Sequence, residues 1–254
     1  MHPLAALSLD DRWFLDVNRF ARDTSWLHGF MRVYAHDAGA VVLGLLVLLA
    51  WWVARRDRHP DRAVAFVLWA AAGTVIAWAV SHYVLKPVFA ELRPYLVLPH
   101  VEVLAARTSE YSFPSGHATV AGAVIAGLWL ARRWILASIA TVLGLLLAFG
   151  RVYVGMHFPA DVAAGLAFGA AVVLLLAWPA VALLQRLDTE VRMRTPFGPL
   201  VSADSTWGRM RPPKWRDHEM SGPPLATPAA SGPPARRRGR RPAALRAPGR
   251  PAPR

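Results

Sequence analysis

The chain of 254 residues contains no cysteine, which excludes disulfide bonds, thiolate metal sites and a cysteine nucleophile. It is also poor in charge, because Asp, Glu, Lys and Arg make up 18% of it, whereas soluble domains carry about 25%. Apolar residues make up 55% of the sequence and are concentrated in long blocks. This distribution excludes a simple soluble globule.

Acidic residues are the scarcer charged type, with 16 Asp and Glu against 29 Lys and Arg. Residues 186–254 hold 15 of the basic residues, 5 of the acidic ones and 13 of the 21 prolines. That segment lacks hydrophobic periodicity, and we predict a disordered, basic, Pro/Arg-rich tail. The favoured interpretation gives the tail no specific partner. The alternative is that its Arg236–Arg241 cluster contacts anionic lipid headgroups or another partner, with nucleic acid disfavoured.

Five apolar blocks are candidates for membrane-spanning helices, each of which needs roughly 20 apolar residues. The blocks are Ala38–Ala54, Ala63–Leu85, Ala118–Ala131, Trp134–Gly150 and Val162–Leu184. The third is short for a span, but its polar N-terminal end can lie in a protein pocket instead of lipid. We therefore predict an all-α, polytopic membrane helix bundle with about five spanning helices, whose core covers residues 38–185. Gly165 and Gly169 fit a small-xxx-small packing face, although incidental glycines in an Ala-rich helix explain them equally well.

Residues 1–37 lack the cationic start and apolar core of a signal peptide. Their apolar residues recur at helical spacing in two groups, 13–20 and 26–34, on either side of the helix-start signal Asp23–Ser25. We predict two short amphipathic helices that lie at the membrane interface. The alternative, a sixth spanning helix, is disfavoured by the charged residues that precede Asp23.

The positions of the arginines predict the orientation of the chain. Basic residues are concentrated in the loop 54–62, in the tight turn at Arg132 and Arg133, and in the C-terminal tail. The positive-inside rule assigns these three segments to the cytoplasm. Segments 86–117 and 151–161 then lie on the extracytoplasmic side of a multi-pass protein of the cell membrane.

The polar residues of these two segments lie at helix ends, and therefore at one depth of the membrane. Eight of them form the candidate site: Lys86, Arg93, Ser115, Gly116, His117, Arg151, His157 and Asp161. Three fixed cations beside a Ser-Gly helix start are typical of a cradle for phosphate or another oxyanion. Two histidines supply a nucleophile and a proton donor near neutral pH, and Asp161 is placed at i, i+4 to share a helix face with His157.

This set argues against a metal centre. A single carboxylate is too few for a magnesium or calcium site, and three cations around a zinc ion are electrostatically unfavourable. We therefore expect no metal and no cofactor. Taken one at a time, each residue also has an ordinary structural explanation, such as snorkelling for the Lys and Arg side chains, so the hypothesis depends on the joint pattern.

The joint pattern resembles the three signature motifs of the type-2 phosphatidic acid phosphatase superfamily. The matching segments are Lys86-x6-Arg93-Pro94, Pro114-Ser115-Gly116-His117 and Arg151-x5-His157-x3-Asp161. One departure is Gly150, since a serine commonly precedes the arginine of the third motif. The glycine removes one possible phosphate donor but none of the core residues.

By this resemblance, His157 is the nucleophile that forms a phosphohistidine, and Asp161 orients it. His117 protonates the leaving oxygen and then activates water for the second step. The resemblance assigns binding of the phosphoryl oxygens to the remaining five residues, Lys86, Arg93, Ser115, Gly116 and Arg151.

The favoured function is a metal-independent membrane lipid phosphatase with its active site on the extracytoplasmic face. Within that class we favour undecaprenyl diphosphate as the substrate, with phosphatidic acid or phosphatidylglycerophosphate as the alternative. Two more distant functions stay open. One is a vanadate-dependent haloperoxidase, and the other is a non-enzymatic membrane anchor whose basic tail binds a partner.

Overall fold

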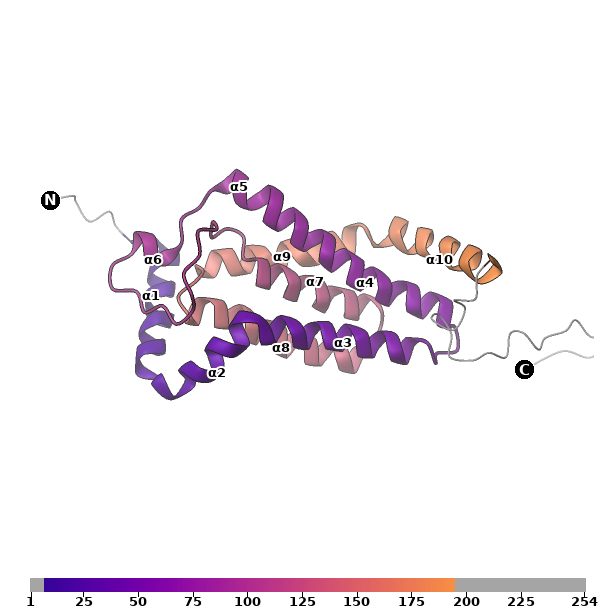
Figure 1. Cartoon of the computed structure of the whole chain (residues 1–254), viewed down its shortest axis with the longest axis horizontal. Helices are drawn as coiled ribbons and strands as arrows, with labels where there is room; N and C mark the ends of the chain where they lie inside the picture. The colour runs from indigo at the N-terminus through magenta and orange to yellow at the C-terminus, as the bar shows by residue number, and fades with distance from the viewer. Residues whose placement is uncertain (1–6, 195–254) are drawn as a thin grey trace, which may run out of the picture. The chain divides into compact units, whose positions relative to one another are not determined.

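The computed structural model describes residues 7–194, with side chains as far as Arg186, and every regular element in that range is helical (Figure 1). The α-helices are α1 (Leu9–Asp23), α2 (His28–Val33), α3 (Gly39–Ala54), α4 (Pro60–Val80), α5 (Lys86–Phe89), α6 (Pro94–Val97), α7 (Gly116–Leu130), α8 (Trp134–Tyr153), α9 (Pro159–Leu175) and α10 (Ala177–Arg194). Two π-helical turns, Tyr34–Ala38 and Ser81–Leu85, continue α2 into α3 and α4 into α5. The all-α prediction is confirmed for this range.

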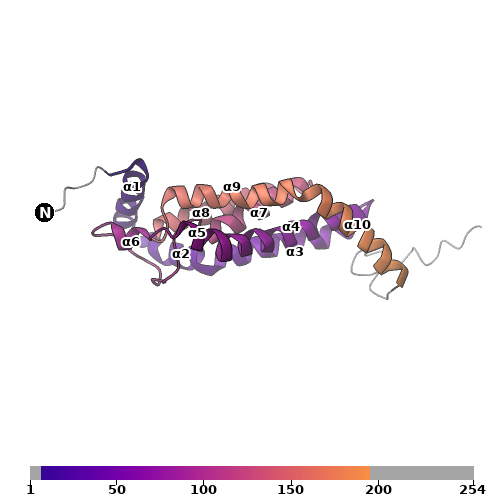
Figure 2. The ribbon, with the colours of Figure 1, turned by 90° about the horizontal axis from the view of Figure 1, so that it is seen from above.

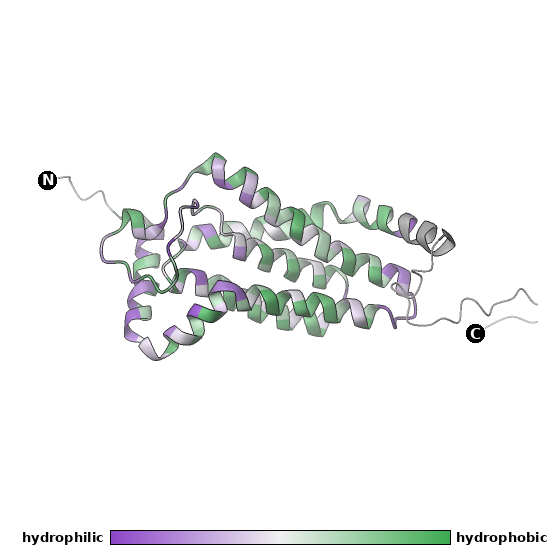
Figure 3. Ribbon diagram, in the orientation of Figure 1, coloured by the Kyte–Doolittle hydropathy of each residue, from purple (hydrophilic) through white to green (hydrophobic). Residues whose placement is uncertain are grey.

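The five predicted apolar blocks are helical, but they do not all have the length of a span. Three helical stretches are long and apolar enough to cross a membrane: Ser25–Ala54, Pro60–Val97 and Trp134–Tyr153. Helices α9 and α10 are bent by 49° relative to each other, and they make a fourth span if the bent pair is counted as one. Helix α7 is apolar but shorter. Residues 7–194 therefore contain three to four helices that fit a span, with apolar residues along the bundle (Figure 3), and five spans stay a prediction.

The N-terminal region differs in part from the prediction. Helix α1 is amphipathic, with Phe14 buried and Trp13 and Phe20 exposed, and it lies across the end of the bundle (Figures 1 and 2). The second interfacial helix is wrong as a separate element, because α2 continues through the turn Tyr34–Ala38 into α3. No proline interrupts residues 25–54, so that they form one helix of 30 residues.

The helical core also extends past residue 185, where we expected it to end. Helix α10 continues to Arg194, and residues 186–194 contain neither proline nor glycine to stop it. The remainder of the predicted disordered tail, including Arg236–Arg241, lies outside the described residues.

Helix α7 lies at the centre of the bundle, packed against α4, α8 and α9. Glycine sets its contact with α9. A Cβ atom on Gly165 would lie 2.6 Å from the Ser115 carbonyl oxygen, and one on Gly169 would lie 2.0 Å from the Thr119 carbonyl oxygen. From the other side, a Cβ atom on Gly122 would lie 2.1 Å from a carbonyl oxygen of α9. The two helices therefore touch backbone to backbone, which confirms the small-xxx-small interpretation.

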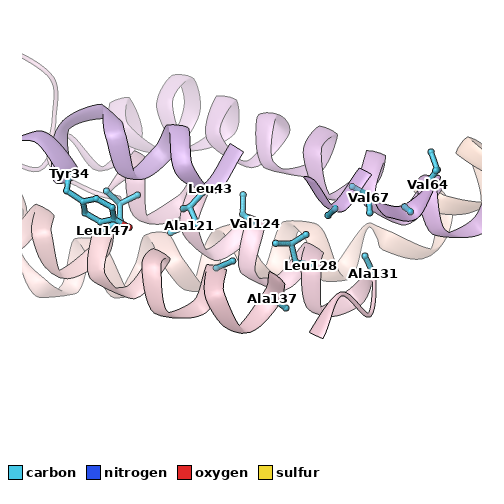
Figure 4. Close-up of a cluster of buried hydrophobic side chains, with 13 residues drawn as sticks. Tyr34, Leu43, Val64, Val67, Ala121, Val124, Leu128, Ala131, Ala137 and Leu147 are labelled. Atoms are coloured by element: carbon cyan, nitrogen blue, oxygen red, sulfur yellow. The ribbon is translucent and has the colours of Figure 1, made fainter. Parts of the chain in front are cut away.

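A cluster of buried apolar side chains joins α3, α4, α7 and α8 (Figure 4). Leu43, Leu128 and Leu147 are fully buried in it. Lipid is as apolar as these side chains, so close packing rather than removal of water stabilises such an interface within a membrane. The cluster holds together helices whose ends carry the candidate site.

Candidate active site

The eight predicted site residues come together at one end of the bundle, around a cavity of about 360 Å³. Six of them line the cavity: Lys86, Arg93, Gly116, His117, Arg151 and His157. The other two, Ser115 and Asp161, are fully buried. The starts of α5, α6, α7 and α9 and the last turn of α8 supply these residues, so that helix ends build the site as the sequence pattern predicts.

The ring of His157 is held between a carboxylate and a guanidinium. Its Nδ1 lies 3.3 Å from Asp161 Oδ2, and its Nε2 lies 3.4 Å from Arg93 Nη1. Burial, followed by the positive charges of Arg151, Arg93 and Lys86, lowers the pKa of His157 well below its usual value of 6.5. The imidazole is therefore neutral near pH 7, the form in which a ring nitrogen is a nucleophile.

Three hydrogen-bond donors fix Asp161 where it faces this ring. Ser112 Oγ donates a hydrogen bond of 2.5 Å to Asp161 Oδ2, and the backbone N–H of Phe158 donates one of 2.9 Å to the same oxygen. The backbone N–H of Ser115 donates to the Asp161 carbonyl oxygen at 3.0 Å. This last bond ties the start of α7 to the start of α9. A backbone hydrogen bond thereby joins the helix start that carries His117 to the one that carries Asp161.

The two arginines are buried and oriented by backbone carbonyl groups. Arg93 is 2% exposed and donates from Nε to the Glu110 carbonyl oxygen at 2.8 Å and from Nη1 to that of Met156 at 2.9 Å. Arg151 is 5% exposed and donates from Nη1 to the Ala35 carbonyl oxygen at 2.7 Å. Neutral acceptors of this kind fix the direction of a guanidinium without cancelling its charge. Both charges therefore remain available to an anion in the cavity.

Lys86 has an acidic partner that sequence reasoning missed. Its Nζ donates a hydrogen bond of 2.6 Å to Glu110 Oε2, and both side chains line the cavity. This hydrogen bond lowers the pKa of Glu110, which therefore remains a carboxylate at neutral pH. An anion that binds at Lys86 has to share or displace this carboxylate.

His117 contacts the first long helix. Its Nε2 lies 2.5 Å from the His36 carbonyl oxygen, and because a carbonyl can only accept, Nε2 carries the proton. In the neutral ring the lone pair is then on Nδ1. Beside it, Gly116 is open toward the cavity, since a Cβ atom there would meet nothing closer than Trp78 at 3.8 Å. The first N–H groups of α7 are free of helical partners, as at any helix start, and favour an anion.

Some buried polar atoms at the site have no partner within the described chain. They are Ser115 Oγ, Arg151 Nε and Asp161 Oδ1. A buried polar atom of this kind is costly unless something else satisfies it, and two of the three are possible donors. Ser115 Oγ and Arg151 Nε are therefore suited to a ligand rich in acceptor oxygens.

The residues that sequence reasoning missed belong to two segments. Glu110 and Ser112 lie just before the Pro-Ser-Gly-His motif, where a polar run ahead of a helix start was a usable signal. His36 and Asp37 line the cavity from the long N-terminal helix. No local signal marks them, because their segment reads as an amphipathic surface helix. In residues 7–194, no group of three or more His, Asp or Glu side chains is placed to hold a metal ion.

Comparison with known proteins gives one family. Residues 63–183 match the family model described as PAP2 superfamily. The chain is 37% identical over 126 residues to the undecaprenyl-diphosphatase BcrC of Bacillus subtilis, covering 48% of this chain and 60% of that protein. It is 35% identical over 137 residues to the decaprenylphosphoryl-5-phosphoribose phosphatase of Mycobacterium tuberculosis, covering 54% of this chain and 69% of the relative. The chain thus spans less than two thirds of the length of the Bacillus protein.

The fold has a counterpart among solved structures. The crystal structure of LpxE from Aquifex aeolicus aligns with a TM-score of 0.50 at 23% sequence identity. The alignment covers 68% of this chain and 96% of the other. At this level of identity, the likeness concerns the arrangement of helices.

Proposed function

We propose that this chain, which belongs to the PAP2 superfamily, is a membrane lipid phosphatase that works without a metal ion. The observation that carries the proposal is the neutral ring of His157, which is held between Asp161 and Arg93 at a cavity with three buried cations. Such a cavity combines an activated nucleophile with fixed positive charge, the two requirements of phosphoryl transfer.

The reaction has two steps. In the first, the Nε2 lone pair of His157 attacks phosphorus and the bond from phosphorus to the leaving oxygen breaks. His117 enters this step as an imidazolium, with its second proton on Nδ1 facing the bound anion, and gives that proton to the leaving oxygen. In the second, water attacks the phosphohistidine and His117 takes the proton of the water. The phosphorus–nitrogen bond then breaks and inorganic phosphate leaves.

The remaining site residues hold the phosphoryl group through both steps. Arg93, Arg151 and Lys86 neutralise the charge on its oxygens, and Ser115 Oγ and the Gly116 N–H donate hydrogen bonds. Asp161 holds Nδ1 of His157, so that Nε2 is the nitrogen that faces the cavity. No step requires a group outside this set.

We favour a polyprenyl diphosphate, undecaprenyl diphosphate, as the substrate. Support comes from the relatives, two of which are named for polyprenyl-linked phosphates. A second, mostly apolar hollow of about 560 Å³ adjoins the cavity, with His36 and Asp37 common to both. Its walls include Val33, Val41 and Leu104, which suit a lipid chain leading away from the phosphate. Phosphatidic acid and phosphatidylglycerophosphate are the alternative substrates.

The deciding experiment is phosphate release by the purified full chain from a panel of lipid phosphates and diphosphates, with EDTA present. We expect release from undecaprenyl diphosphate, unchanged by EDTA and absent from His157→Ala. Loss of activity with EDTA would overturn the metal-independent mechanism. Bromide oxidation that requires vanadate and peroxide would favour a haloperoxidase, and loss of function on deletion of residues 195–254 with no phosphate release would favour an anchor.

We propose further that the cavity faces the extracytoplasmic side and that the C-terminal segment is cytoplasmic, on the strength of the arginine-rich loop between α3 and α4. Because the chain has no cysteine, single cysteines report orientation cleanly. On intact cells, Ser109→Cys should react with a membrane-impermeant thiol reagent and His59→Cys should not. The opposite labelling would reverse the orientation.

A further inference from the structure

The π-helical turn Tyr34–Ala38 touches two site residues through its backbone. The carbonyl oxygen of Ala35 accepts a hydrogen bond of 2.7 Å from Arg151 Nη1, and that of His36 accepts one of 2.5 Å from His117 Nε2. Two successive carbonyl groups of one helix therefore hold a phosphate-binding cation and an acid–base residue. π-Helical turns inside α-helices are frequent at functional sites.

The turn can reach these side chains because α8 approaches it closely. Gly150 is buried, and a Cβ atom on it would lie 3.0 Å from Ala35 Cβ and 3.8 Å from Met31 Sδ. One turn earlier on α8, Leu147 packs against Gly39, where an added Cβ atom would lie 2.8 Å from Leu147 Cδ1. One further turn back, the Tyr34 hydroxyl donates to the Leu143 carbonyl oxygen at 2.8 Å. A single face of α8, ending at Gly150, is thus fitted to the turn.

We infer that the turn Tyr34–Ala38 is a positioning element of the catalytic site and that Gly150 sets its distance from Arg151. The inference rests on the proposed function, and it assigns Ala35 and His36 as positioning residues that act through their carbonyl oxygens. It also accounts for the residue at which this chain departs from the family motif. Gly150 does not merely lack a serine hydroxyl; it makes room for the helix that orients the neighbouring arginine.

The two hydrogen bonds have different consequences for the chemistry. The bond from Arg151 to the Ala35 carbonyl oxygen fixes Nη1, while Nε of the same guanidinium is buried and has no partner within the described chain. The bond from His36 fixes the proton of His117 on Nε2, so that Nδ1 is the nitrogen that exchanges protons with the substrate. Displacement of the turn disturbs both groups at once.

Substitutions at Gly150 test this inference, with Gly44→Ala as the matched control. Gly44 lies in the same long helix as the turn, and a Cβ atom there would meet nothing within 4 Å. At Gly150, an added Cβ atom forces Ala35 to give way by a few tenths of an ångström. Because a misplacement of about 1 Å can cost ~10²-fold in rate, we expect Gly150→Ala to lose about tenfold in turnover. Gly150→Ser should lose at least as much, and Gly44→Ala nothing.

A second substitution distinguishes positioning from general damage. Ala35→Gly removes the Cβ atom that the new side chain meets, while it keeps the carbonyl group that binds Arg151. We expect the double variant Ala35→Gly/Gly150→Ala to regain most of the lost turnover, although glycine in a helix lowers its stability by about 1 kcal/mol. Folded Gly150→Ala with normal turnover, Gly150→Ser more active than the natural chain, or a folded double variant without recovery would each overturn the inference.

Binding of inorganic phosphate tests the inference without turnover. A ligand of the folded state raises the melting temperature, and at a given concentration the rise is larger for tighter binding. The phosphate-induced rise should therefore shrink in Gly150→Ala and return in the double variant. If the natural chain released no phosphate from any lipid but still showed this pattern, the proposed function would fail and the positioning of Arg151 would stand. An equal phosphate-induced rise in the natural chain and in Gly150→Ala would refute the positioning itself.

Discussion

Arginine is used differently at the two ends of the helix bundle. At the cavity, Arg93 and Arg151 are 2% and 5% exposed and donate to backbone carbonyl groups. At the other end, the guanidinium of Arg56 lies 3.7 Å from the centroid of the exposed Trp52 ring, and Arg133 donates to Asp57 at 2.7 Å on the surface. The first set is almost fully desolvated, whereas Arg56 is exposed and Arg133, with a side chain 15% exposed, bonds to a partly exposed carboxylate.

This difference shows what makes a cation part of a site. Snorkelling explains arginines at either end equally well when they are counted along the sequence. Arg56 at the opposite end also donates to a carbonyl oxygen, that of Trp52, at 3.0 Å, but it is exposed. The cavity end adds burial to such neutral acceptors, which orient the guanidinium and leave its charge for a ligand. The opposite end uses aromatic rings and a carboxylate partner, which anchor the helices at the interface. The following variants test this contrast.

Loss of the nucleophile should have the largest effect. We expect His157→Ala to reduce turnover at least ~10⁴-fold on every substrate, because the covalent intermediate forms on this ring, which Asp161 orients. His117→Ala should still form a phosphoenzyme with a diphosphate, whose leaving group needs little protonation, and should then hydrolyse it slowly. Rapid quench with labelled substrate measures both. Phosphoenzyme in His157→Ala, or none in His117→Ala, would reverse the assigned roles.

Replacement of an arginine by lysine should separate the two ends most directly. We expect Arg93→Lys and Arg151→Lys each to lose roughly 10²–10³-fold in turnover, because a point charge cannot reproduce the fork of donors. Arg56→Lys at the opposite end is the matched control and should keep normal turnover. If both kinds of variant were equally active, the buried arginines would be no more than anchors.

Loss of the Ser112 hydroxyl, which holds Asp161, should reduce turnover less than loss of either arginine. Ser112→Ala removes the 2.5 Å hydrogen bond to Asp161 Oδ2 and leaves that carboxylate with fewer donors. A hydrogen bond to a charged group contributes about 1.5–3 kcal/mol, which corresponds to a loss of about 10- to 100-fold in turnover. Ser109→Ala, at an exposed position of the same loop, is the control. Equal activities for the two variants would show that Asp161 is held without Ser112.

The smallest effect belongs to the surface pair of the opposite end. The hydrogen bond from Arg133 lowers the pKa of Asp57, so the carboxylate stabilises the fold at pH values above its unfolded pKa of about 3.9 and loses this contribution as the pH falls through the lower, folded value. Since Asp57 is 40% exposed, the contribution is about 0–1 kcal/mol after solvent screening. Arg133→Ala should thus lower the melting temperature slightly at pH 7 and by less as the pH falls below about 3.9, with turnover unchanged. A large loss of turnover would mean that this end also contributes to the site.

Most of the site could be predicted because its residues follow a fixed spacing at helix ends. The apolar blocks located the helices, and the polar residues that bounded them converged as expected. Glu110 and Ser112 were missed because they lie in an irregular loop, where spacing carries no information about direction. His36 was missed for a different reason. It contributes a backbone carbonyl, which any residue possesses, so its role is visible only in the hydrogen bond that His117 donates to it.

The prediction of a second, separate interfacial helix was wrong, because the helix that begins there continues into the apolar block that follows. Residues 26–34 have the periodicity of an amphipathic helix, and they are helical in the structure. What the pattern could not show is that the turn Tyr34–Ala38 keeps the helix continuous with the apolar block that follows. Further along this continuous helix, His36 and Asp37 line the cavity.

The glycine contact between α7 and α9 also has a mechanical consequence. Gly165 and Gly169 allow the backbones of α7 and α9 to approach closely, and the bond from the Ser115 N–H to the Asp161 carbonyl oxygen joins the starts of the two helices. These contacts therefore fix the spacing between the helix starts that carry His117 and Asp161. A displacement of one helix start relative to the other would therefore have to break the bond from Ser115 and open the glycine contact.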